Sequence, residues 1–92
     1  MECRIVIFTD KDGKEIGRSE HDTSLISSLP RKDDTILDQV VLYNNAESRK
    51  KLTHAIVRIV EFDFSKWMVT IYAEVIRTLS SNEHISGIFQ NI

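Results

Sequence analysis

The feature that most constrains the fold is the alternation of side-chain types between Trp67 and Ile76. One set of alternate positions is apolar, namely Trp67, Val69, Ile71, Ala73 and Val75. The other set is mixed, namely Met68, Thr70, Tyr72, Glu74 and Ile76. A period of two in a segment rich in β-branched and aromatic residues is typical of a half-buried strand. The apolar run at 55–62 and the intervening residues Asp63–Lys66 complete a predicted antiparallel hairpin.

Three other segments indicate further strands. Residues 3–9 are apolar on both faces, which is typical of a strand that is central in its sheet or covered by another element. Asp12-Gly13 predicts a hairpin turn, and the polar return strand at 15–20 suits a charged sheet edge. Residues 35–43 have apolar spacing compatible with a helix, whereas the β-branched and aromatic run at 39–43 favours a strand.

The C-terminal residues have the pattern of a helix. Ser80-Ser81-Asn82-Glu83 matches a capping box, and Ile85, Ile88, Phe89 and Ile92 follow at helical spacing. Residues 46–53 fit either a short helix or a long polar loop. The predicted fold is therefore α+β: residues 1–92 form a single domain with a small antiparallel sheet or partly open β-barrel of about five strands and a short C-terminal helix.

Composition restricts the class of protein. A chain of 92 residues is expected to form one domain with a modest core, and a net charge of -2 gives no overall attraction to nucleic acid or to an anionic membrane. The single cysteine excludes an intramolecular disulfide. No apolar run is long enough to cross a bilayer, and the N-terminus lacks a signal-peptide pattern. We therefore expect a cytoplasmic protein.

No motif carries a recognisable catalytic or metal-binding function. The histidines, His21, His54 and His84, lack the spacing of a zinc site, and the glycines are too scattered for a phosphate-binding loop. Cys3 lies in an apolar run, whereas a nucleophilic cysteine needs a partly exposed, electropositive setting. We expect no enzymatic activity, no catalytic residues, and no cofactor or metal.

The leading functional interpretation is a small protein-binding, regulatory or accessory module that self-associates, most simply as a homodimer. The predicted strands carry apolar residues on two faces, and one short helix cannot readily cover both, so an uncovered face is expected to meet another chain. Trp67, Tyr72 and Phe89 are the candidate partner-binding residues, because aromatic residues are enriched among those that dominate binding energy. If Trp67 and Tyr72 both lie in one strand, their odd separation places them on opposite faces.

The sequence also leaves two alternative functions open. The first is a small nucleic-acid-binding β domain that uses Arg49, Lys50, Lys51 and Arg58, and whose affinity would fall steeply with salt. The second is a binding site for a small ligand between two subunits. The sequence does not identify ligand-binding residues for this second alternative.

Overall fold

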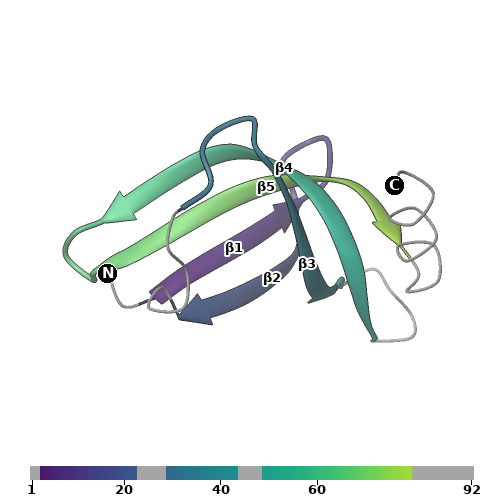
Figure 1. Ribbon diagram of the computed structural model, residues 1–92, viewed down its shortest axis with the longest axis horizontal. Coiled ribbons are helices and arrows are strands. Elements are labelled where there is room, and N and C mark those ends of the chain that lie inside the picture. The colour runs from purple at the N-terminus through teal and green to yellow at the C-terminus, as the bar shows by residue number, and fades with distance from the viewer. Residues whose placement is uncertain (1–2, 23–28, 44–48, 80–92) are drawn as a thin grey trace, which may run out of the picture.

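The computed structural model (Figure 1) describes residues 3–22, 29–43 and 49–79. These residues form five strands in one sheet: β1 (Cys3–Thr9), β2 (Glu15–Asp22), β3 (Thr35–Val41), β4 (Lys50–Asp63) and β5 (Met68–Leu79). The spatial order is β2-β1-β5-β4-β3. The β1–β5 pair is parallel and the other three pairs are antiparallel, so the sheet is mixed.

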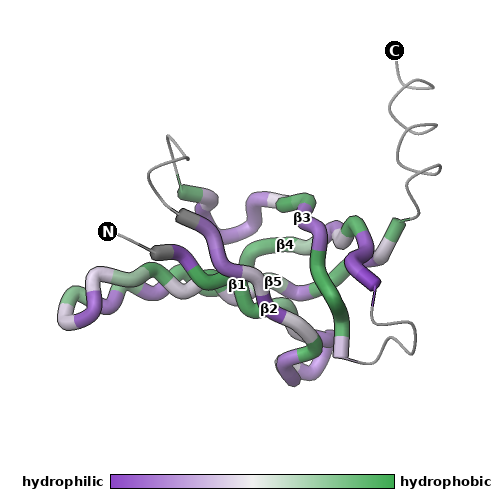
Figure 2. The backbone as a smooth tube through the Cα atoms, turned by 90° about the horizontal axis from the view of Figure 1, so that it is seen from below, coloured by the Kyte–Doolittle hydropathy of each residue, from purple (hydrophilic) through white to green (hydrophobic). Residues whose placement is uncertain are grey.

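The sheet curls into a half-barrel because its longest strands bend. The pairing of β4 with β5 shifts register between His54 and Ala55 and again between Val57 and Ile59, and such bulges bend a strand. In Figure 2 the strands curve around a common centre, and hydrophobic residues recur along β1, β3, β4 and β5. The two edge strands approach each other, and the backbone N–H of Tyr43 donates to the carbonyl of Ile16 at 2.8 Å.

Glycine is required where the two edges meet. A Cβ atom at Gly17 would lie 2.9 Å from Leu42 Cδ2 and 3.0 Å from Val40 Cγ1, closer than ordinary contact. Two residues before β2, Gly13 has a φ of 86° and makes the predicted β1–β2 turn. The local glycine pattern therefore shapes both the first hairpin and the closing of the curl.

The hydrophobic core occupies the concave face of the sheet. Its buried members are Val6, Phe8, Val40, Leu42, Ala55, Val57, Val69, Ile71 and Ala73. The alternation predicted for the last strand is confirmed here, because Val69, Ile71 and Ala73 are fully buried. On the convex face the register places Tyr72 between Ile7 and Ile59, and Ile59 is largely exposed.

The α+β prediction is wrong, because the described residues are all β. Residues 35–41 form β3, which begins before the predicted start at 39, and β4 begins at Lys50, inside the segment interpreted as a helix or loop. Pairing between β3 and β4 explains both differences, since tertiary pairing outweighs local preference. The predicted helix after Ser80 lies outside the described residues. The part of the chain that the structure describes contains no helix that could span a membrane.

Candidate functional site

The tip of the β4–β5 hairpin lies at one end of the sheet (Figure 1). Three aromatic side chains gather at this tip. Phe62, Phe64 and Trp67 are 51%, 69% and 58% exposed. The Phe62 and Phe64 rings are stacked with centroids 6.3 Å apart, and Phe64 meets Trp67 edge-on at 6.4 Å. These three residues are called the aromatic tip below. Clustered exposed hydrophobic residues usually mark an interaction surface.

The turn below the aromatic tip is fixed by Asp63. Its Oδ1 accepts hydrogen bonds from the Ser65 hydroxyl at 2.6 Å, from the Ser65 N–H at 3.0 Å and from the Lys66 N–H at 3.3 Å. The hydroxyl bond lowers the pKa of the Asp63 carboxyl below its ordinary value, despite an opposing effect of desolvation. Trp67 completes the turn with a φ of 52°, in the left-handed region. The aromatic rings are therefore presented on a preorganised loop, which reduces the entropy lost on binding.

The outer half of β4 is a free sheet edge beside the aromatic tip. β3 pairs with β4 only from Lys50 to Ile56, and the backbone of Val57 bonds to Asp33 and Asp34. Among the described residues, no strand pairs with residues 58–63 on the side away from β5. An unpaired edge offers a row of backbone donors and acceptors to another chain.

A groove of about 520 Å³ runs along this free edge. Its apolar lining is Leu29, Pro30, Ile59, Val60 and Phe62, and its cations are Arg31, Lys32 and Arg58. Arg58 is already engaged, because its Nε lies 3.3 Å from Glu74 Oε1 and its Nη1 lies 3.9 Å from Asp33 Oδ1. The groove, the free edge and the aromatic tip share Phe62, so they form one continuous surface.

The structure separates the predicted partner-binding residues. Trp67 is not in the strand but in the turn, where it is exposed rather than part of the apolar face. Tyr72 is half-buried on the convex face, and Phe89 lies outside the described residues. Phe62 and Phe64 were missed because the sequence pattern places them at the end of a strand and in a turn. The sequence feature that could have identified them is the presence of three aromatic residues around one predicted turn.

The predicted nucleic-acid residues do not form one patch. Lys50 and Lys51 begin β4, opposite Val41 and Val40, whereas Arg58 lies beyond the bulge. The eight residue-to-residue steps from Lys50 to Arg58 correspond to roughly 26 Å along a strand. Arg58 is also ion-paired to two carboxylates. The described geometry therefore gives little support to a continuous basic stripe for a phosphate backbone.

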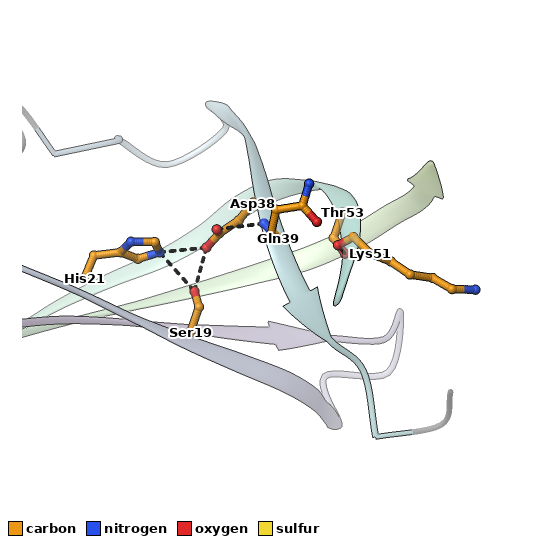
Figure 3. Close-up of polar contacts among 6 residues, drawn as sticks. All are labelled: Ser19, His21, Asp38, Gln39, Lys51 and Thr53. Atoms are coloured by element: carbon orange, nitrogen blue, oxygen red, sulfur yellow. Dashed lines mark hydrogen bonds and ion pairs between the residues drawn. The ribbon is translucent and has the colours of Figure 1, made fainter. Parts of the chain in front are cut away.

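A polar cluster joins the two edge strands on the concave side (Figure 3). Asp38 Oδ2 of β3 lies 2.6 Å from Ser19 Oγ and 2.7 Å from His21 Nε2, both of β2. Ser19 Oγ also lies 3.2 Å from the same ring nitrogen. A catalytic triad instead has serine on one imidazole nitrogen and the carboxylate on the other. Because Ser19 donates directly to Asp38, the cluster ties two strands together rather than activating a nucleophile.

A second group of side-chain contacts joins the same two edges of the sheet. The line along which β2 meets β3 and the residues that follow it is called the seam below. The Tyr43 hydroxyl donates to Glu15 Oε2 at 2.6 Å, and Arg18 Nη2 lies 2.8 Å from Glu15 Oε1. The hydrogen bond from Arg18, followed by that from Tyr43, lowers the pKa of Glu15. The same bond to Glu15 raises the pKa of Tyr43. The closed seam therefore favours an ionised Glu15 and a neutral Tyr43.

This seam predicts a specific pH dependence of stability. Glu15 has a folded-state pKa below its ordinary value of 4.5, so its contribution is complete above that value. It is lost as the pH falls through the lower folded-state pKa. Between about pH 7 and about pH 3, Glu15→Gln should therefore show a smaller drop in Tm than the wild type. Glu20→Gln, an exposed acid on the same strand, is the control, and an equal drop in wild type and Glu15→Gln would contradict the assignment.

Comparison with family models, curated proteins and solved structures found no match to this chain. Among residues 3–22, 29–43 and 49–79, no group of three or more His, Cys, Asp or Glu side chains is arranged to hold a metal ion. The strongest feature is the surface formed by the aromatic tip, the free edge of β4 and the groove beside it.

Proposed function

We propose that this protein is a non-enzymatic binding module that works as a homodimer, with the free edge of β4 and the aromatic tip as its interface. The observation that carries the proposal is the position of Phe62, Phe64 and Trp67, three exposed aromatic residues at an unpaired strand edge. Aromatic residues dominate the energy of many interfaces, and an open edge can accept another strand by backbone hydrogen bonds. In a two-fold symmetric dimer, one contact covers the free edge and the aromatic tip of both chains.

The register of this contact follows from the faces of β4. Val60 and Phe62 pair with Ile71 and Val69, so they lie on the concave side, whereas Ile59 and Glu61 lie on the convex side. A two-fold axis perpendicular to the sheet pairs concave positions with concave positions. If the axis passed beside Glu61, the Glu61 side chains of the two chains would lie directly opposite each other, and the repulsion of like charges makes this unfavourable. If the axis passed beside Ile59, the new ladder would have to include Val57, whose backbone is already hydrogen-bonded to residues 33–34.

An axis that passes beside Val60 avoids both problems. It uses only residues 58–62 and places Val60 opposite the partner subunit's Val60. Phe62 then lies opposite the partner subunit's Arg58 in the ladder, and Arg58 can keep its ion pair to Glu74. The aromatic tips flank the new strand pair and exclude water from its ends.

Amide hydrogen exchange tests this pairing directly. Outward-facing amides within residues 58–62 should gain protection as the protein concentration rises through the dimer dissociation constant, because their N–H groups enter the new ladder. The fully buried Val69, Ile71 and Ala73 in the middle of the sheet serve as the internal reference. Unchanged exchange at residues 58–62, under conditions where the mass doubles, would place the interface elsewhere and overturn the proposed edge pairing.

A further inference from the structure

A second cavity opens on the concave face, on the inner side of the seam between β2 and β3. Its volume is about 440 Å³, within the range of small-molecule pockets. Val6, Ile36 and Ile71 supply apolar walls, together with Leu29 and Pro30. The charged or polar lining comes from Arg4, His21, Asp34 and Asp38. The cavity is thus open on one side and has a mixed lining, with apolar walls beside four charged or polar side chains.

Arg4 is the unusual member of this lining. The residue is only 7% exposed, and its Nε is buried without a hydrogen-bond partner among the described residues. Burial lowers the pKa of the guanidinium, an effect that the nearby Asp38 carboxylate opposes. A buried cation is costly unless its donors are satisfied, so an orphaned donor beside a cavity points to a missing acceptor.

The two carboxylates that line the cavity already accept hydrogen bonds from other groups of the chain. Asp38 Oδ2 accepts from Ser19 and His21, and its Oδ1 accepts from the backbone N–H of Gln39 at 2.8 Å. Asp34 Oδ2 accepts from the backbone N–H of Arg31 at 2.8 Å. Both acids are therefore engaged in holding the strands and the loop, whereas Arg4 retains unused donor capacity.

From this geometry we infer that the cavity binds a small monocarboxylic acid with an apolar body, its carboxylate on Arg4 and its hydrocarbon part against Val6, Ile36 and Ile71. A guanidinium matches a planar carboxylate by two parallel hydrogen bonds. A monoanion fits better than a dianion such as phosphate, because Asp34 and Asp38 line the same space. This inference uses the concave face and does not depend on the proposed dimer.

Calorimetric titration with octanoate tests the inference, with octanamide as the neutral ligand of the same length. Octanoate should bind at one site per chain, and octanamide about 10- to 100-fold more weakly, which corresponds to the loss of a charged hydrogen bond. Octylammonium should not bind. This comparison uses the wild-type protein, so it does not depend on the folding of any variant.

A variant pair then assigns the binding to Arg4. Arg4→Met should weaken octanoate binding about 10- to 100-fold, and its Tm without ligand should equal or exceed that of the wild type because a buried donor without a hydrogen-bond partner is removed. Arg77→Met removes an exposed arginine from β5 and should leave octanoate binding unchanged. The inference is overturned by octanamide binding as tightly as octanoate, by Arg4→Met retaining wild-type affinity, or by no octanoate binding at millimolar concentration.

Discussion

Replacing Phe64 with serine and Trp67 with asparagine in one chain is expected to raise the dimer dissociation constant by at least about 100-fold, because truncation of a single aromatic anchor can cost about 2 kcal/mol or more. Both side chains are mostly exposed in the single chain, so the change should alter the free energy of unfolding of the monomer by about 0.5 kcal/mol or less. Asparagine is chosen at position 67 because it tolerates the left-handed backbone there.

The matched control is Ile76→Ser. Ile76 is 51% exposed, as is Phe62, but it lies on β5 away from the hairpin tip. Sedimentation velocity over a range of concentrations should give the same dimer dissociation constant for Ile76→Ser as for the wild type. Equal weakening by both variants would mean that general surface hydrophobicity, rather than the aromatic tip, drives the association.

Phe8→Ala is expected to lower the free energy of unfolding by about 3–5 kcal/mol, a large part of the total stability of a domain of this size. Phe8 is fully buried, and its neighbours in register are Ala73 of β5 and Gly17 of β2. These neighbours have small side chains and cannot fill the space, so the cavity left by the ring should persist. Urea denaturation followed by circular dichroism measures the loss.

Ile7→Ala is the control for this prediction, because Ile7 is adjacent in the chain but lies on the convex face. It should cost about 1 kcal/mol, the central value for point substitutions. If Ile7→Ala costs as much as Phe8→Ala, the core does not lie on the concave face alone.

Sequence patterns predicted the strands best where the determinants are local. The alternation along residues 69–73 identified the buried face of β5, and Asp12-Gly13 marked the first hairpin. The parallel pairing of β1 with β5 was not predicted, because it joins residues 65 positions apart, such as Cys3 and Met68, and has no local signature. The early start of β4 was missed because Lys50 and Lys51 favour solvent, and only their pairing with β3 makes them part of a strand.

The candidate site was less predictable than the strands. Trp67 was identified from its residue type, but its role depended on a turn whose geometry is set by Asp63 and Ser65. The free edge of β4 appears only when the short length of β3 is known. Arg4 looked like one polar residue in an apolar strand, and its burial follows from the curl of the whole sheet.

The proposed homodimer requires a second copy of the chain to cover the free edge and the aromatic tip. Light scattering coupled to size-exclusion chromatography, over a range of loading concentrations, tests it most directly. The mass should rise with concentration from the 10.6 kDa of one chain to twice that value. A constant mass of one chain at every concentration would contradict it.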